Sequence, residues 1–193
     1  MRNAWTVAAL AGALALTGCD SGTAPEAAAT GTASAEAPAE APPAANAVEL
    51  RGDGLAAGPE SFFFAAGQAE VEAALAKALG PKLRTGENRE CGAGPVTFTD
   101  YAGGLTAHFQ KGQLVGWNWH AMQDGDTAPK GTVTLAGAVQ VGSARSVVVA
   151  APGFAKVDGS TLGEEFTLGE NRGGFIAGDK VEMLFAGTQC FFR

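Results

Sequence analysis

The chain has 193 residues, of which 46% are hydrophobic and 17% are charged, a composition typical of a globular protein with a sizeable core. Its 20 acidic residues outnumber its 13 basic residues and give a formal net charge of -7 at pH 7. This acidity, together with the lack of any basic run, argues against binding to nucleic acid or to an anionic lipid surface.

Residues 1–18 have the pattern of a processed signal segment. Arg2 supplies a positive charge, and the apolar run from Ala4 to Leu16 is shorter than the roughly 20 residues that a membrane-spanning helix needs. The run ends in Leu-Thr-Gly-Cys at residues 16–19, which resembles the lipobox of bacterial lipoproteins. We therefore expect a lipid on Cys19 and a protein anchored on the periplasmic side of the inner or outer membrane. A plain secretory signal that happens to contain a cysteine is the alternative.

Residues 19–46 predict a linker. After Cys19 the stretch holds Ala, Pro, Glu, Thr, Ser, Gly, Asp and one Asn, without aromatic residues, Leu, Ile or Val. Such a composition buries too little apolar surface to offset the entropy of ordering, so we expect disorder. As a flexible coil it reaches roughly 25–30 Å, enough to hold a domain away from a membrane.

The remaining residues, 47–193, predict one globular domain. Cys91 and Cys190 are left over once Cys19 carries a lipid, and the periplasm permits disulfides. We expect these two residues to pair, with two buried thiols as the alternative. Neither lies in a Cys-x-x-Cys motif, which argues against a redox-active pair.

The first part of this domain predicts a helix and a hairpin. Apolar residues recur at helical spacing from Val71 to Leu79, and Gly80-Pro81 ends the pattern. Later, Leu105–Phe109 and Leu114–Trp119 alternate apolar and polar residues on either side of a turn. This pattern predicts a β-hairpin with one buried face.

The second part repeats this order. Gly142 follows Gly67 by 75 residues in similar contexts, and Phe185 follows Phe109 by 76, with a second hairpin expected over 181–192. We therefore predict an α+β fold of two similar units, at about 48–122 and 131–193. Each unit has a helix or helix pair packed on an antiparallel sheet.

The segment 143–151 is ambiguous. Val147-Val148-Val149 favours a strand, whereas Ser143 as an N-cap and Pro152 as a stop favour a helix. Because the corresponding segment of the first part is predicted to be a helix, we predict a helix here as well.

Gly-x-small-x-x-Val at the start of a helix, followed by a hairpin whose second strand ends in aromatic residues, resembles the β-lactamase-inhibitor-protein type of tandem domain. The single unit is similar to SmpA/OmlA lipoproteins, and residues 105–109, 116–117 and 186–193 resemble segments of uncharacterised bacterial lipoproteins. The resemblance implies helices packed on an antiparallel sheet over about 60–193. It also implies that a concave sheet face meets a protein partner.

Motifs for catalysis or cofactor binding are weak. Gly52-Asp53-Gly54 lacks the strand and helix that a dinucleotide fingerprint needs, and the two histidines, His108 and His120, lack the spacing of a zinc site. Ser160 lies outside a nucleophile elbow, and the adjacent Glu164 and Glu165 point to opposite faces of a strand. We therefore expect no catalytic residues, no metal, no nucleotide and no cofactor.

The candidates for partner contact are aromatic and polar residues of the predicted sheet. Aromatic side chains are common anchors at interfaces and also common in cores. The resemblance to inhibitor-type tandem domains implies that residues on the polar face of the hairpin are also candidates for partner contact. The candidates are Tyr101, Thr106, His108, Trp117, Asn118 and Trp119. We predict a non-catalytic protein-binding or scaffold module of the cell envelope. Inhibition of a periplasmic or secreted hydrolase, or an enzyme with scattered catalytic residues, is the alternative.

Overall fold

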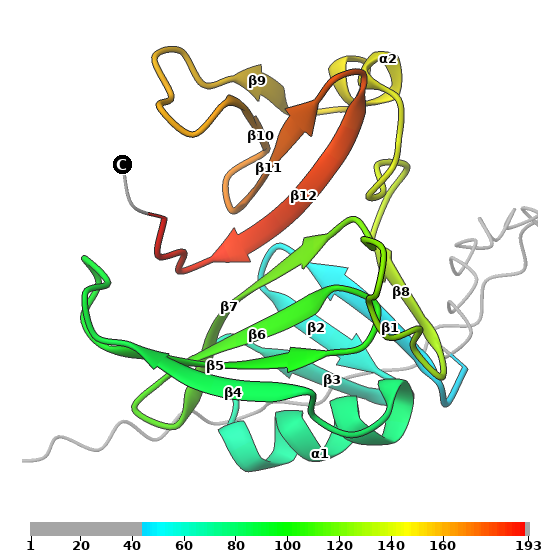
Figure 1. The fold of residues 1–193 in the computed structure, drawn as a ribbon, viewed down its shortest axis with the longest axis vertical. Coiled ribbons are helices and arrows are strands. Elements are labelled where there is room, and N and C mark those ends of the chain that lie inside the picture. The colour runs from blue at the N-terminus through cyan, green and yellow to red at the C-terminus, as the bar shows by residue number, and fades with distance from the viewer. Residues whose placement is uncertain (1–43, 192–193) are drawn as a thin grey trace, which may run out of the picture. The chain divides into compact units, whose positions relative to one another are not determined.

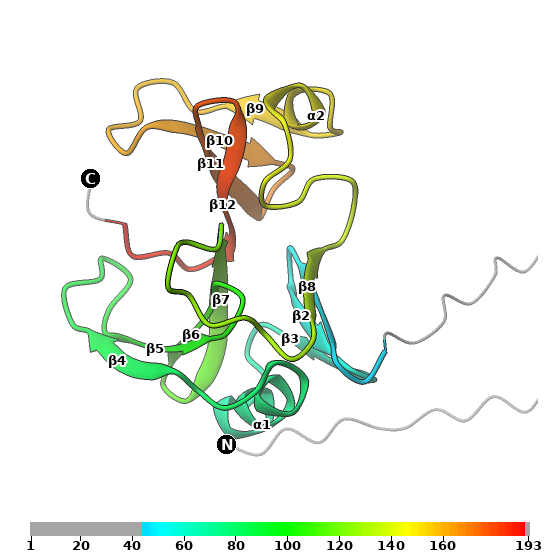
Figure 2. The ribbon, with the colours of Figure 1, turned by 45° about the vertical axis from the view of Figure 1, so that its right-hand side comes forward.

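A computed structural model describes residues 44–191 (Figures 1 and 2). The linker and signal expectations for residues 1–43, including lipid at Cys19, lie outside the described residues. The helices are α1 (Gln68–Leu79) and α2 (Arg145–Val149). The strands are β1 (Ala47–Arg51), β2 (Gly54–Ala57), β3 (Glu60–Phe63), β4 (Arg84–Asn88), β5 (Val96–Tyr101), β6 (Leu105–Gln110), β7 (Gln113–His120), β8 (Thr132–Leu135), β9 (Phe154–Lys156), β10 (Glu164–Leu168), β11 (Arg172–Ala177) and β12 (Lys180–Gly187).

The larger sheet has eight antiparallel strands in the order β4-β5-β6-β7-β12-β11-β10-β9. Four consecutive strands follow α1, four follow α2, and the last strand of each set meets the other at the centre of the sheet. At this junction Trp117 lies opposite Ala186, and Trp119 lies opposite Leu184. We call α1 with β4–β7 the first half, and α2 with β9–β12 the second half.

The smaller sheet has four strands in the order β3-β2-β1-β8. Strands β1, β2 and β3 form an antiparallel meander, whereas β1 and β8 run parallel, with Val48 opposite Val133. The parallel pairing joins the start of the domain to the segment that connects the two halves.

The core lies between the smaller sheet, α1 and one face of the larger sheet. Trp117 is fully buried there, and its Nε1 donates to the carbonyl oxygens of Arg51 and Gly54, both at 2.9 Å. Tyr101 and Phe109 pack in the same cluster, which Phe166 extends into the second half. Trp117 belongs to β7 of the larger sheet, and both of its acceptors belong to strands of the smaller sheet. The buried, hydrogen-bonded indole therefore links the two sheets.

Helix α1 covers the first half as the sequence predicted. Val71, Leu75 and Leu79 are buried, and Gly80 ends the helix at a φ of 109°, a backbone conformation that favours glycine. The Glu72 carboxylate accepts hydrogen bonds from Gln68 at 3.0 Å, Lys82 at 2.5 Å and Thr99 at 2.7 Å. Because Thr99 belongs to β5, this buried group ties the helix to the sheet.

The predicted hairpin is confirmed in β6 and β7. Its two turn residues, Lys111 and Gly112, have φ values of 53° and 75°. Two positive φ values are typical of the turn whose twist suits a two-residue hairpin. The predicted disulfide is also present, since Cys91 and Cys190 are bonded with their Cα atoms 5.0 Å apart.

The second half departs from the sequence prediction in three ways. Phe109 lies in β6, the third strand after α1, whereas Phe185 lies in β12, the fourth strand after α2, so the 76-residue correspondence is wrong. Residues 188–191 are not a strand. Helix α2 exists but has only five residues, and Ala144 rather than Ser143 is its N-cap.

The fold is α+β in the broad sense, with far more strand than helix among residues 44–191. Each half has one helix and no helix pair. No helix in this range is long and apolar enough to cross a membrane.

Candidate functional site

Within residues 44–191, no helix packs on the face of the larger sheet opposite to α1, which we call the open face. Cross-strand pairing places Asp100, Thr106, Asn118 and Phe185 in one row across β5, β6, β7 and β12. Side chains that are directly opposite one another in a sheet share a face, so this row is one continuous surface. The open face comprises Phe98, Asp100, Thr106, His108, Asn118, His120, Phe175, Met183 and Phe185.

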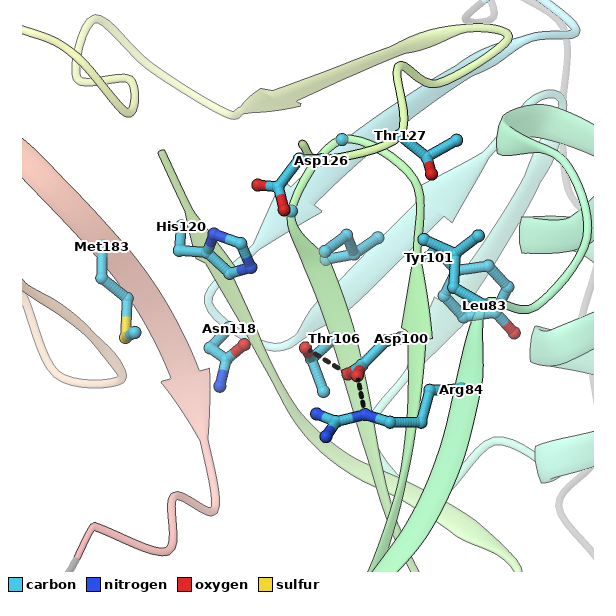
Figure 3. A pocket seen from close by; sticks show the side chains of 13 residues that line it. Leu83, Arg84, Asp100, Tyr101, Thr106, Asn118, His120, Asp126, Thr127 and Met183 are labelled. Carbon is cyan, nitrogen blue, oxygen red and sulfur yellow. Dashed lines mark hydrogen bonds and ion pairs between the residues drawn. The ribbon is translucent and has the colours of Figure 1, made fainter. Parts of the chain in front are cut away.

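One end of this face is a polar pocket of about 400 Å³ (Figure 3). The Asp100 carboxylate lies at its base, where it accepts hydrogen bonds from Arg84 Nε at 2.7 Å and from Thr106 Oγ1 at 2.8 Å. The Arg84 guanidinium also lies over the Phe98 ring, 5.1 Å from its centroid. Asp100 therefore pairs with a guanidinium and a hydroxyl at the pocket.

His120, Asp126 and Met183 line the same pocket (Figure 3). The Nδ1 atom of His120 lies 3.0 Å from the carbonyl oxygen of Ala121, which makes Nδ1 the protonated nitrogen and leaves Nε2 as an acceptor. Asp126 accepts a hydrogen bond from the backbone of Gln123 at 2.8 Å, which fixes the loop that carries it.

His108 lies on the open face but is only 8% exposed. Burial lowers its pKa to about 4, although the nearby Asp100 carboxylate acts in the opposite direction. Asn118 Nδ2 lies 3.3 Å from His108 Nε2, so the amide donates to a neutral imidazole. The side chain is therefore an uncharged part of the surface at pH 7.

The other end of the open face carries three aromatic rings in mutual contact. Phe175, Phe185 and Phe191 have centroids 5.2 to 5.7 Å apart, and each ring is half-buried. We call these residues the aromatic cluster. Such rings combine a large apolar area with little conformational freedom, which suits them to contact another molecule.

Phe191 is held there by the segment 188–191, which we call the C-terminal strap. Gln189 Nε2 donates to the carbonyl oxygens of Trp117 at 3.0 Å and Ala186 at 2.9 Å, and Cys190 is bonded to Cys91 in the β4–β5 loop. The strap crosses β7 at Gly116, where an added Cβ would lie 2.5 Å from the Thr188 carbonyl oxygen. The strap thus forms one wall of the open face.

The structure divides the predicted partner-contact residues into two groups. Thr106, His108 and Asn118 lie on the open face as expected. Trp117 and Tyr101 are 0% and 2% exposed, so they are core residues and cannot contact a partner in this conformation. Trp119 is half-buried on the opposite face, where its Nε1 donates to the Gly103 carbonyl oxygen at 3.0 Å.

Several residues of the pocket were missed by the sequence reasoning. Arg84 and Asp100 lie in β4 and β5, two strands for which the sequence analysis made no prediction. The alternation from Val96 to Tyr101 is a strand signal that identifies Asp100 as a residue of the same face. Asp126 lies in a loop between elements, where no periodicity marks it.

Among residues 44–191, no group of three or more His, Cys, Asp or Glu side chains is placed to hold a metal ion. Ser160 donates to Glu165 at 2.7 Å rather than to a histidine, and Glu164 pairs with Arg145. Glu164 and Glu165 are neighbours on β10 and engage different partners, as strand alternation predicts.

Comparison with protein-family models, curated proteins and solved structures finds no match to this chain. The case for a function therefore rests on the open face, with its polar pocket, aromatic cluster and disulfide-bonded strap.

Proposed function

We propose that this protein is a lipid-anchored module of the bacterial cell envelope that binds a protein partner through the open face without catalysing a reaction. Cys19 carries the anchor, and residues 20–46 are the tether. The module acts by presenting a rigid surface.

The aromatic cluster is the single observation that carries this proposal. Three half-buried rings lie beside a row of polar side chains on a sheet face that neither helix of residues 44–191 covers. A buried aromatic anchor surrounded by polar residues is the usual anatomy of a protein interface. The partner is expected to present a basic surface, because a net charge of -7 steers positively charged surfaces toward this chain.

Two groups of the open face, His108 and Thr106, are poorly placed for acid–base catalysis. His108 is neutral and buried, and the Thr106 hydroxyl is already engaged with Asp100. Catalysis needs a nucleophile and a base within hydrogen-bond reach of each other. We therefore propose a binding surface rather than an active site.

Site-specific photo-crosslinking in cells tests the proposal. A crosslinking amino acid at Met183 on the open face should give one discrete adduct, whereas the same group at Val147 on α2 should give none. Phe191→Ala should weaken the Met183 adduct and leave Tm nearly unchanged, with the exposed Val149→Ala as the matched control. Equal adducts from Met183 and Val147, or substrate turnover lost on a single polar substitution, would contradict the proposal.

Lipid attachment has its own test. A fatty-acid analogue should label the wild-type chain but not Cys19→Ser, because only the lipobox cysteine accepts the lipid. Equal labelling of both proteins would remove the anchor from the proposal without affecting the open face.

We also infer that the two halves are structural repeats, with a spacing of 67 residues rather than 75 or 76. Strands β6 and β11 begin at residues 105 and 172 and end at 110 and 177, and β7 and β12 begin at 113 and 180 and end at 120 and 187. Both pairs differ by 67 at each end. This spacing aligns Trp117 with Leu184 and Phe109 with Ile176, and all four side chains are buried.

A further inference from the structure

A second cavity adjoins the polar pocket, and the two share His120 and Gly103 in their walls. This second cavity also has a volume of about 400 Å³. Its walls include Trp119, Met122, Pro129, Val133 and Val141, and we call it the apolar pocket.

The apolar pocket offers mostly hydrophobic surface. The indole nitrogen of Trp119 already donates to Gly103, so its ring presents only carbon atoms to a ligand. Met122 is 46% exposed at the rim, and Val133 and Val141 are half-buried. Covering these side chains is favourable through removal of apolar surface from water, and methionine adapts to varied ligand shapes.

The polar pocket offers both donors and acceptors. Arg84 supplies a guanidinium, Asp100 and Asp126 supply carboxylates, and His120 Nε2 is a free acceptor. Thr106 and Thr127 add hydroxyl groups. A group rich in hydroxyls both donates and accepts, so it matches this lining, whereas an anionic group would face two carboxylates and one guanidinium.

We propose that the two cavities form one binding site for a neutral amphiphile. The hydroxyl-rich head group lies in the polar pocket, the alkyl chain lies in the apolar pocket, and His120 marks the boundary between them. The size and lining of the combined site suit a small molecule, since ligand sites are concave, largely apolar and oriented by a few polar groups. The apolar part of this site lies off the open face, whereas its polar part, which includes Met183, lies on it.

Octyl glucoside is a suitable probe, because it joins a neutral hydroxyl-rich ring to an alkyl chain. It is titrated into the mature protein below its micelle concentration, with binding followed by calorimetry and tryptophan fluorescence. Trp117 is buried and Trp119 is half-buried, so we expect a saturable emission shift that Trp119→Phe abolishes while calorimetric binding persists. Hexanol and glucose, each carrying one part of the probe, should bind more weakly than octyl glucoside.

Two variants separate the two parts of the site. Val141→Phe fills the apolar pocket and should weaken both octyl glucoside and hexanol by about tenfold or more. Thr106→Val removes a hydroxyl at nearly constant shape and should weaken octyl glucoside while hexanol binding stays unchanged. Val147→Phe adds the same ring to an exposed position on α2 and should change neither. Unchanged Tm in each variant shows that the fold is intact.

Three results would overturn the proposal. They are no saturable binding of octyl glucoside below its micelle concentration, no effect of Val141→Phe, and hexanol binding as tight as that of octyl glucoside. A protein adduct from a crosslinker at position 141, without amphiphile binding, would assign the apolar pocket to a protein partner instead. Met183 lines the polar pocket, so the two proposals are distinguished at Val141, which lies off the open face: Val141→Phe should weaken amphiphile binding and leave the protein adduct at Met183 unchanged.

Discussion

The two halves of the larger sheet have the same strand order but different support. In the first half, α1 has 12 residues and buries Val71, Leu75 and Leu79 against the sheets. In the second half, α2 has five residues, buries Val148, and leaves Val147 and Val149 41% and 52% exposed. Strand pairing is therefore similar in the two halves, whereas the stabilising core is concentrated behind the first half.

The largest loss of unfolding free energy should come from truncating the core side chains Trp117 and Leu184, which occupy equivalent positions at the 67-residue spacing. Trp117→Ala should cost about 3–5 kcal/mol or more, because it opens a cavity and leaves the Arg51 and Gly54 carbonyl groups without their donor. Leu184→Ala should cost less, about 2–3 kcal/mol. Urea unfolding of both variants measures the difference. A larger cost for Leu184→Ala would reverse the comparison.

Removing the disulfide should destabilise the domain, because this bond covalently links the two halves. The bond joins the β4–β5 loop of the first half to the segment after β12, across 99 residues. The double variant Cys91→Ser/Cys190→Ser should lose about 2–4 kcal/mol of unfolding free energy, since the unfolded chain regains freedom. Reductant should destabilise the wild type by a similar amount and leave the variant unchanged. Two free thiols in the denatured, unreduced protein would refute the pairing.

The unfolding free energy should depend on pH because of His108, the buried histidine of the first half. Because burial lowers the pKa of His108 to about 4, the unfolded chain takes up a proton near its ordinary pKa of 6.5 while the folded chain does not. The unfolding free energy should therefore fall by roughly 2–3 kcal/mol as the pH drops from 6.5 to 4. His108→Gln should flatten this dependence. The same pH dependence of unfolding free energy in the wild type and in His108→Gln would contradict the burial of His108.

The smallest change in unfolding free energy should come from the polar side chains that link a helix to the sheet in each half. Burial raises the pKa of Glu72, but hydrogen bonds from Lys82, Gln68 and Thr99 together outweigh it and hold the pKa below the ordinary 4.5. A lowered folded-state pKa means stability above pH 4.5 that is lost as the pH falls below it.

Glu72→Gln should therefore cost about 1 kcal/mol at pH 7 and little at pH 3. In the second half, Arg145 links α2 to Glu164 of β10 and to Asp179, and this group is solvent-accessible. Arg145→Ala should change the unfolding free energy less than Glu72→Gln does. Equal losses in urea titrations would mean that burial does not distinguish the two links.

The sequence predicted the features with local signals. Helix α1 shows in the spacing from Val71 to Leu79, and the β6–β7 hairpin shows in its alternation and its Lys111-Gly112 turn. The β-strands of the smaller sheet were missed, because Gly54–Ala57 has little β-propensity and is held by packing on both sides. The repeat was placed at the wrong spacing because short Gly and Phe matches carry little information about strand order.

The candidate site was predicted only in its central part. Alternation identified Thr106, His108 and Asn118, since side chains two residues apart share a face. It could not tell that Trp117 and Tyr101 belong to the buried side, because interface and core use the same aromatic residues. Arg84, Asp126 and Phe191 reach the site from other elements, and their placement depends on tertiary contacts that no local pattern encodes.

The parallel pairing of β1 with β8 sets the order in which the domain can be completed. Val48 pairs with Val133, 85 residues further along the chain, so β1 leaves the ribosome long before one of its two neighbours exists. Until β8 arrives, β1 presents an open backbone edge, which is a site for mispairing with other chains. Pairings so distant in sequence also slow folding. We therefore expect the domain to need protection while it is synthesised, and to reach its native state only after its last strands have emerged.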